Sequence, residues 1–317
     1  MTLVGKNSEK NNQNLMQLIR RAHGLVENPD LEKHRQSQDH IGELLGNSKE
    51  IQYRPVDIDG MDAEWVSVNR AHMKKYVILH CHGGGYSTGS SIYARTLTSK
   101  LAAGTSMDVL CFDYRLAPEH KFPVPLEDCY AAAKALYTNQ LILNTDPEKI
   151  TIIGDSAGGN LTAAVCLMAR DKGEFTPRRQ ILIYPALGNC YTEESPYRSV
   201  QENGCDYLLT SVKMEDYLNL YQSSAEDRQN PYFAPILEKD LRNLPETLIL
   251  TAEYDPLRDE GEVYGRKLHA AGNHVEVHRI YGAFHGFFAL GIKFLHVQES
   301  FKYINQFLNK SYEKILQ

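Results

Sequence analysis

The chain lacks any long apolar run, and neither sign of charge strongly predominates. No stretch approaches the roughly 18 consecutive apolar residues that a membrane-spanning helix needs. The first residues, MTLVGKNSEKNNQN, do not contain the apolar core of a secretion signal. The 34 basic and 40 acidic residues give a formal net charge of −6, which does not indicate a nucleic-acid partner. We therefore expect a cytoplasmic protein that has no membrane span and does not bind nucleic acid.

The chain also lacks paired cysteine motifs. It has six cysteines and no CxxC sequence. Four of them fall in segments predicted to be strands or helices, and we interpret these as buried free thiols of a reduced cytosolic protein: Cys81, Cys111, Cys129 and Cys166. Cys190 and Cys205 lie in one segment and could pair, although nothing in the sequence favours this.

Short apolar segments alternate with helical patterns along most of the chain. A hairpin is predicted at 51–68, with Asp59-Gly60 as its turn. The strands predicted after it are 74–81, 108–115, 149–155, 179–185, 246–255 and 275–282. The helices predicted between and after them are 91–103, 125–138, 160–170, 259–272 and 294–316. Apolar strands that alternate with helices are typical of the α/β class, with a mostly parallel sheet covered on both faces.

Two segments fall outside this alternation. Apolar residues recur at helical spacing between positions 15 and 26 and predict an amphipathic helix. The segment 188–235 is rich in tyrosine and is predicted to form helices and loops. We interpret residues 1–317 as a single α/β domain, with a cap formed by about 1–48 and by the insertion at about 188–235.

The sequence IGDSAGG at 153–159 contains a candidate nucleophile. It matches G-x-S-x-G, with a predicted strand before it and a predicted helix after it. In such a turn the serine is exposed at the carboxyl edge of the sheet, and the helix directs free N–H groups at whatever binds there. Ser156 is therefore the predicted nucleophile. The alternative is an ordinary tight turn.

A serine hydroxyl needs a base within hydrogen-bond reach, and that base needs an acid to orient it. In this architecture the chain order is serine, acid, histidine. Asp255 is the last residue of the strand predicted at 246–255, whereas Asp259 and Glu260 suit the N-terminus of the next helix. His285 is the only later histidine in a glycine-flanked loop directly after a strand. We predict Asp255 as the acid and His285 as the base.

Acyl transfer also needs donors for the oxyanion that forms. One predicted donor is the N–H of Ala157, and the others come from the glycine-rich loop at 82–86, which has the sequence HGGGY. A metal site at His80 and His82 is the competing interpretation, but no third ligand stands nearby in the sequence.

These motifs together resemble the hormone-sensitive lipase family of α/β-hydrolase-fold esterases. The resemblance runs from about residue 50 to 290 and depends on HGGGY, DYRLAPEHKFP, GDSAGG, NPYFAPI, DPLRDEGEVYGRKLHAAG and HGF, in the family's order and spacing. It implies an α/β-hydrolase fold, a triad of Ser156, Asp255 and His285, and no metal or organic cofactor. It implies an oxyanion hole formed by Gly83, Gly84 and Ala157, a helical cap, and a preference for short acyl chains.

The resemblance implies supporting roles for other residues. Asp113, Arg115 and Glu119 of the DYRLAPE segment would brace the catalytic loops. Tyr86 and Asp155 are predicted to bind substrate, and for Asp155 the alternative is that it braces the loop.

The sequence therefore predicts a serine hydrolase that cleaves small carboxylic esters through an acyl-enzyme. Two alternatives stay open. The first is a small-molecule receptor that binds in the capped pocket without turnover. The second is an amidase, peptidase or lyase with the same fold, because one fold hosts many chemistries. The sequence is compatible with a homo-oligomer and does not decide the oligomeric state.

Overall fold

The computed structural model describes residues 30–46, 49–68, 76–141, 145–291 and 293–313. The helix predicted between positions 15 and 26, and most of the N-terminal part of the predicted cap, lie outside these residues. Within the described ranges, no helix is long and apolar enough to cross a bilayer.

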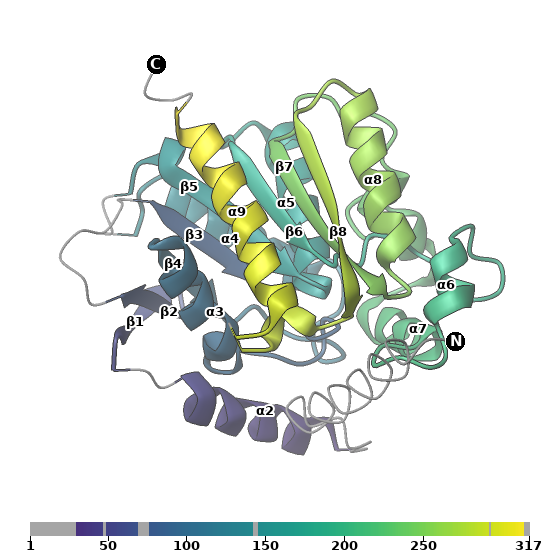
Figure 1. Ribbon diagram of the computed structural model, residues 1–317, viewed down its shortest axis with the longest axis horizontal. Helices are drawn as coiled ribbons and strands as arrows, with labels where there is room; N and C mark the ends of the chain where they lie inside the picture. Colours follow the sequence, from purple (N-terminus) through teal and green to yellow (C-terminus); the bar gives the residue numbers. More distant parts are fainter. Residues whose placement is uncertain (1–29, 47–48, 69–75, 142–144, 292, 314–317) are drawn as a thin grey trace, which may run out of the picture.

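One eight-stranded sheet forms the centre of the molecule (Figure 1). Its strands are β1 (Ile51–Ile58), β2 (Met61–Val68), β3 (Val77–Cys81), β4 (Asp108–Phe112), β5 (Ile150–Asp155), β6 (Arg179–Ile183), β7 (Glu246–Tyr254) and β8 (Val275–Phe284). They are arranged in the order β1-β2-β4-β3-β5-β6-β7-β8. The hairpin β1–β2 and the pair β2–β4 are antiparallel, and all other pairs are parallel. The predicted α/β class and mostly parallel sheet are confirmed.

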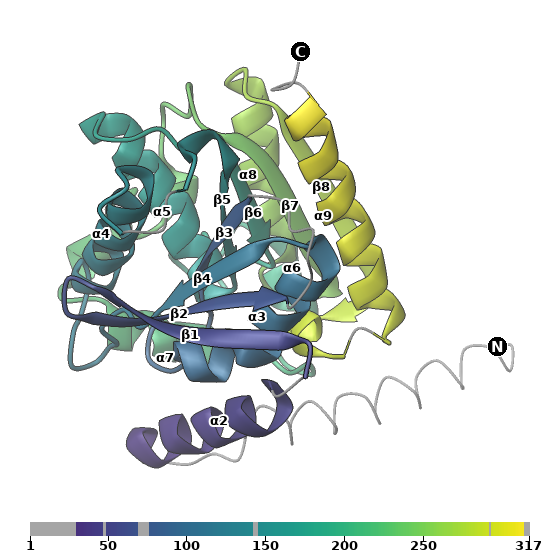
Figure 2. The same ribbon diagram turned by 90° about the vertical axis from the view of Figure 1, so that its left-hand side faces the viewer.

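Helices cover both faces of this sheet, as Figures 1 and 2 show. The helices are α2 (Leu31–Gly46), α3 (Ser91–Thr105), α4 (Val124–Tyr137), α5 (Ala157–Lys172), α6 (Arg198–Asn203), α7 (Ser211–Tyr221), α8 (Arg258–Ala270) and α9 (Leu295–Glu313). Helices α3 and α9 pack on one face, and α4, α5 and α8 pack on the other. Both faces of the parallel strands are therefore buried, which explains their continuous apolar sequences.

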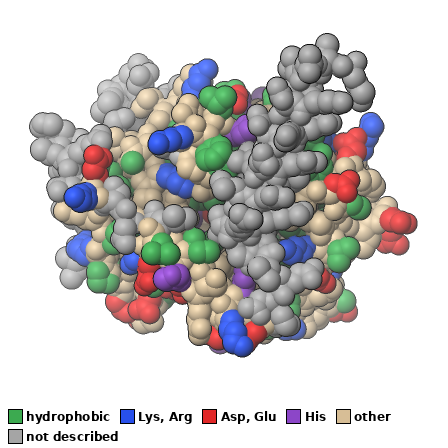
Figure 3. All heavy atoms as spheres, turned by 60° about the horizontal axis from the view of Figure 1, so that its bottom comes forward, with side chains coloured by type: hydrophobic (Ala, Val, Ile, Leu, Met, Phe, Trp, Pro, Cys, Tyr) green, Lys and Arg blue, Asp and Glu red, His purple; other side chains and the backbone are tan. Residues whose placement is uncertain are grey.

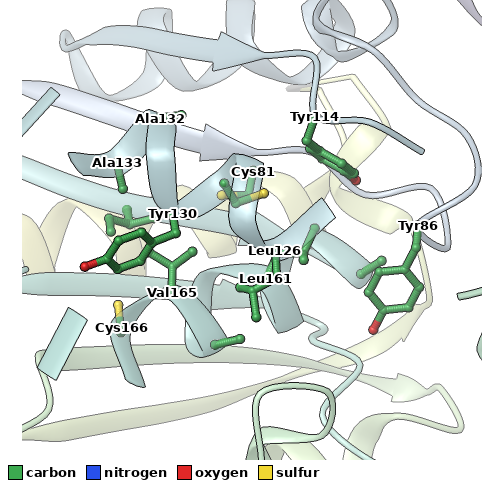
Figure 4. Close-up of a cluster of buried hydrophobic side chains, with 14 of the residues drawn as sticks. Cys81, Tyr86, Tyr114, Leu126, Tyr130, Ala132, Ala133, Leu161, Val165 and Cys166 are labelled. Atoms are coloured by element: carbon green, nitrogen blue, oxygen red, sulfur yellow. The ribbon is translucent and has the colours of Figure 1, made fainter. Parts of the chain in front are cut away.

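Alternation along the strands divides the core between the two faces. Ile78 and Ile153 belong to the cluster under α3 and α9, whereas Leu79 and Ile152 belong to the cluster under α4 and α5. Figure 4 shows part of the second cluster, with Leu161 and other labelled side chains of α4 and α5 packed together. The four cysteines predicted to be buried are buried free thiols, and Cys190 and Cys205 are also free.

Three elements outside the alternation lie at one end of the sheet. Helices α2 and α7 lie at the bottom of Figure 1 and remain on that side in Figure 2, and α6 lies above α7 at the right of Figure 1. Turning this face forward shows acidic, basic and histidine side chains interspersed over the coloured surface (Figure 3). Strands β3, β5, β7 and β8 are followed at their carboxyl ends by the loops that contain the predicted reactive residues.

Candidate active site

The turn between β5 and α5 holds Ser156 in a strained backbone conformation. Its φ of 56° and ψ of −121° lie outside the regions that a residue with a side chain normally adopts. Hydrogen bonds to the neighbouring strand and its loop fix this conformation: Ser156 N–H donates to Ile183 O at 2.9 Å, and Ser156 O accepts from Ala186 N at 3.2 Å. The side chain is thereby presented at the carboxyl edge of the sheet.

Two glycines allow the helix to begin so close to the strand. A Cβ atom on Gly154 would overlap the carbonyl oxygen of Gly158, and a Cβ atom on Gly158 would overlap that of Cys81. The glycines of G-x-S-x-G are therefore required by the packing of the backbone around the serine. The turn is tight, and its glycines let the strand and the helix approach closely on either side of Ser156.

Ser156, His285 and Asp255 form a continuous hydrogen-bonded series. Ser156 Oγ lies 2.8 Å from His285 Nε2, and His285 Nδ1 lies 2.8 Å from Asp255 Oδ2. Asp255 is completely buried, and its Oδ1 accepts the N–H of Leu257 at 2.9 Å. A carboxylate can only accept, so the His285 proton sits on Nδ1 and Nε2 is left to accept the serine proton. This geometry can convert a serine hydroxyl into a nucleophile.

The strands that present the acid and the histidine are joined by Glu253. Its Oε2 accepts the N–H of Gly282 at 2.7 Å, near the irregularity where the pairing of β7 and β8 shifts. Strand β8 extends to Phe284, two residues beyond the predicted end, so His285 follows it directly. Glu253 lies within the strand predicted at 246–255, and the sequence analysis assigns it no role. The only sequence signal for it is a second acidic residue two positions before Asp255.

The structure corrects the predicted oxyanion donors. Gly83 N–H donates to Asp155 Oδ1 at 3.1 Å and is therefore not free to bind an oxyanion. Among the described residues, the N–H groups of Gly84 and Gly85 have no hydrogen-bond partner. The N–H of Ala157 is at the first turn of α5 and has no partner within the helix. Gly85 is a candidate donor that the sequence analysis did not name, although the run of three glycines contains it.

Carbonyl partners fix the direction of the two free N–H groups. His82 Nδ1 lies 2.8 Å from Gly83 O, and Gly84 O accepts from Thr88 N and Thr88 Oγ1, both at 3.0 Å. In a planar trans peptide the N–H points opposite to the C=O. The N–H groups of Gly84 and Gly85 therefore point away from these partners, and both glycines line the cavity that contains Ser156.

His82 is a buried neutral residue that supports this loop. Burial lowers its pKa to about 4, so it is uncharged at neutral pH, and the contact with Gly83 O places its proton on Nδ1. Its ring stacks on Tyr114 at 4.2 Å. His80 instead lies 3.1 Å from Asp155 Oδ1 through its Nε2 atom. The two histidines considered as an alternative metal site thus have other partners. No group of three potential metal ligands occurs among the described residues.

Of the two residues predicted to bind substrate, Asp155 lines the cavity and Tyr86 does not. Asp155 lines the cavity, but its Oδ1 atom already contacts Gly83 N and His80, so it braces the glycine loop. Tyr86 is 1% exposed, its ring stacks on Tyr221 at 3.9 Å, and it does not line the cavity. The prediction that Tyr86 contacts substrate is therefore corrected: the positive φ of 62° turns its side chain into the core.

The DYRLAPE side chains also have partners around this loop. Asp113 Oδ1 accepts the N–H of Ser91 at the start of α3. Arg115 forms a two-pronged ion pair with Asp128, through bonds of 2.8 and 2.7 Å. Glu119 accepts two bonds from Arg35 of α2, at 3.0 and 2.8 Å. Asp113 and Glu119 thus contact elements next to the glycine loop, while Arg115 joins the segment to α4.

The cavity beside Ser156 measures about 930 Å³ when its open mouth is included. It is lined by the glycine loop, by α3, and by side chains of α2 and α7, among them His34, Gln38, Lys213 and Tyr217. Tyr184 and His285 both line the cavity, and their rings lie 4.8 Å apart. The site can therefore enclose a small molecule with both apolar and polar groups.

Glu260 is a completely buried carboxyl that sequence reasoning assigned only to a helix N-terminus. Its Oε1 accepts from Leu187 N at 2.7 Å and from the Tyr191 hydroxyl at 2.9 Å, so it attaches the start of the 188–235 segment to α8. Burial raises its pKa from 4.5 to about 8, and the nearby charge of Asp255 acts in the same direction.

Because the pKa of Glu260 is raised in the folded state, we expect the stability of the protein to depend on pH. Between about pH 5 and 8 the folded state keeps the Glu260 proton and the unfolded state does not, so the folded state binds more protons and rising pH favours unfolding. We expect the free energy of unfolding of the wild type, measured by urea titration, to decrease over this range relative to Glu260→Gln. Parallel pH curves for the two proteins would contradict a raised pKa.

Comparison with known proteins places this geometry in a family. Residues 78–289 match a family model described as the alpha/beta hydrolase fold. The chain is 36% identical over 213 residues to an arylesterase of Saccharolobus solfataricus, in an alignment that covers 67% of this chain and 68% of that one. It is also 36% identical over 216 residues to an ethyl acetate hydrolase of Pseudomonas putida, which covers 68% of this chain and 66% of that one.

The fold of this chain is similar to that of a solved esterase structure over most of its length. A hyperthermophilic esterase from Pyrobaculum calidifontis superimposes with a TM-score of 0.80 at 34% identity, covering 92% of this chain and 97% of that one. The likeness therefore extends over the sheet and its covering helices, and the predicted α/β-hydrolase fold is confirmed.

Proposed function

Because the chain belongs to the hormone-sensitive lipase-like family of α/β-hydrolase-fold proteins, we propose that it hydrolyses small carboxylic esters through an acyl-enzyme on Ser156. The observation that supports this most strongly is the pair of 2.8 Å contacts that link Asp255, His285 and Ser156. Free backbone N–H groups lie in the same cavity. The esterase names of the relatives agree with this activity.

The first half-reaction begins when His285 Nε2 takes the Ser156 proton while Oγ attacks the ester carbonyl. The carbonyl oxygen becomes an oxyanion that accepts hydrogen bonds from the N–H groups of Gly84, Gly85 and Ala157. Buried Asp255 stabilises the imidazolium that forms and keeps its orientation. His285 then protonates the departing alcohol, and the acyl group stays on Ser156.

The second half-reaction uses the same groups on water. His285 takes a proton from a water molecule, the resulting hydroxide attacks the acyl carbonyl, and the oxyanion occupies the same donors. Collapse of the intermediate returns the proton to Ser156 and releases the carboxylic acid. No step requires a metal or an organic cofactor.

Two elements cover this site in the proposed enzyme. Helix α2 and the 188–235 segment both contribute side chains to the cavity, including His34 and Lys213, and they form its cap. The cap limits the size of the acyl and alcohol groups. The four buried free thiols agree with a reducing compartment, so the cytoplasmic location remains our prediction.

A substrate panel tests this function. We expect p-nitrophenyl esters to be hydrolysed, with kcat/KM decreasing steeply beyond an acyl length of about six carbons, because the capped pocket limits the number of methylene groups that it can accept. The matched p-nitroanilides are expected to react far more slowly. Faster anilide turnover would favour an amidase, and stoichiometric binding of the esters without release of p-nitrophenol would favour a receptor.

A further inference from the structure

One turn of α2 contacts the loop that follows the glycine run. Arg35 Nε donates to Ser87 O at 2.9 Å, and Gln38 Oε1 accepts the N–H of Gly89 at 3.2 Å. Arg35 and Gln38 are three residues apart and therefore lie on the same face of the helix. Gln38 is only 5% exposed, so its side-chain amide is buried. These contacts join residues about 50 positions apart in the sequence.

Two further features hold α2 against this region. Asp39 Oδ1 accepts the hydroxyl of Ser90, the residue that caps α3. A Cβ atom on Gly42 would overlap the carbonyl of Ile92, so α2 packs on α3 with the two backbones in close contact. The position of α2 is therefore fixed relative to α3 and to the loop between β3 and α3.

The contacted loop determines the direction of the free N–H groups. Thr88 lies between the two contacted residues, and its N–H and hydroxyl hold Gly84 O. Gly89 has a φ of +97°, and a Cβ there would lie 2.6 Å from Gly83 O. Movement of the loop would thus turn the two peptide groups whose N–H atoms belong to Gly84 and Gly85.

We propose that Arg35 and Gln38 are positioning residues for the oxyanion hole, so that α2 supports transition-state stabilisation as well as covering the pocket. This inference rests on the proposed function. Neither residue needs to touch the reacting atoms, because each acts through the 87–89 loop. Loss of the contact should therefore decrease kcat more than it increases KM, since the donors act mainly on the oxyanion of the transition state.

The central experiment compares Gln38→Ala with the wild type on p-nitrophenyl butyrate. We expect kcat to decrease about tenfold and KM to change less than about twofold, a smaller effect than the roughly 10²–10³-fold loss on deleting an oxyanion donor. Gln38→Glu should retain most of the wild-type kcat, because its carboxyl still offers an acceptor for the Gly89 N–H. Gln36→Ala, an exposed position of the same helix, is the matched control.

A transition-state analogue separates positioning from pocket shape. An alkyl trifluoromethyl ketone forms a bond between its carbonyl carbon and Ser156 Oγ, the serine proton moves to His285, and the ketone oxygen becomes an oxyanion. We expect its inhibition constant to increase in Gln38→Ala by the same factor as kcat/KM decreases. An unchanged inhibition constant, or an increase in KM alone, would overturn the proposal and leave α2 as a pocket wall.

A second pair of variants tests the Arg35 contact. Arg35→Met removes the bonds to Ser87 O and Ala117 O as well as the ion pair with Glu119, whereas Glu119→Gln weakens only the ion pair. We expect the first to decrease kcat at least about fivefold and the second to stay within about twofold. Equal effects of both would overturn the role of the bonds that Arg35 donates to the backbone. Thermal melting of every variant shows whether it is folded, and a wild type without esterase turnover would refute the proposed function itself.

Discussion

Replacement of Ser156 by alanine is expected to lower kcat/KM for a short-chain p-nitrophenyl ester by at least about 10³-fold. The substitution removes the only hydroxyl that lies 2.8 Å from His285 Nε2 among the described residues. Without it no acyl-enzyme can form, and the remaining activity comes from binding and from the oxyanion donors acting on water. The measurement is the initial rate of p-nitrophenol release under pseudo-first-order conditions.

The control for this substitution is Ser37→Ala. Ser37 is an exposed serine of α2, so the same chemical change there should leave the rate within about twofold of the wild type. Far-UV circular dichroism should show that Ser156→Ala is folded. A folded Ser156→Ala protein that keeps more than about a tenth of the wild-type rate would show that another group is the nucleophile.

Asp255→Asn is expected to decrease kcat by about 10³–10⁴-fold. The reason is specific to this site: Asp255 Oδ1 accepts the N–H of Leu257, so an asparagine keeps its oxygen there and turns its NH₂ group towards His285 Nδ1. His285 must then carry its proton on Nε2, where it cannot accept the proton of Ser156. The variant also loses the negative charge that stabilises the imidazolium.

Asp259→Asn is the matched control for this prediction. Asp259 lies four residues later, accepts the N–H of Ser199 at 2.8 Å, and forms an ion pair with Arg258. It does not contact His285, so its substitution is expected to change stability more than kcat. Measured on folded proteins, a decrease of less than about tenfold for Asp255→Asn would contradict its role as the acid.

The fold and the three hydrogen-bonded residues could be predicted because both depend on where the strands end along the sequence. A parallel sheet gathers the carboxyl ends of its strands at one edge, so residues just after predicted strands must lie close together. Ser156 and His285 each follow a strand directly, and Asp255 follows β7, so the positions of strands were sufficient to bring them together. The glycines around Ser156 were informative because their close contacts are with neighbouring backbone.

Local sequence patterns were not sufficient to identify the donors of the oxyanion hole. Whether Gly83 or Gly85 offers a free N–H is decided by the direction of each peptide plane, and that direction depends on partners such as Asp155 and Thr88. The same is true of Tyr86, which is adjacent to the glycines but turns into the core against Tyr221. Such orientations become visible only when the tertiary contacts are known.

The contacts of α2 and of Glu260 could not be predicted from the sequence for a related reason. Gln38 contacts Gly89 across 51 positions, and Glu260 contacts Leu187 across 73. Gln38 belongs to none of the motifs. Glu260 lies in DPLRDEGEVYGRKLHAAG, but a buried carboxyl at a helix N-terminus has the same sequence pattern as an exposed one. Their partners follow from how the two cap elements pack on the sheet.

The most direct test of the account is covalent labelling of the wild type with an alkyl fluorophosphonate. Attack of the activated serine forms an Oγ–P bond, fluoride leaves, and the proton passes to His285, so the product is stable enough for mass spectrometry. We expect one adduct per chain, on the peptide that contains Ser156, and no adduct on folded Ser156→Ala. An adduct on another residue, or equal labelling of both proteins, would contradict it.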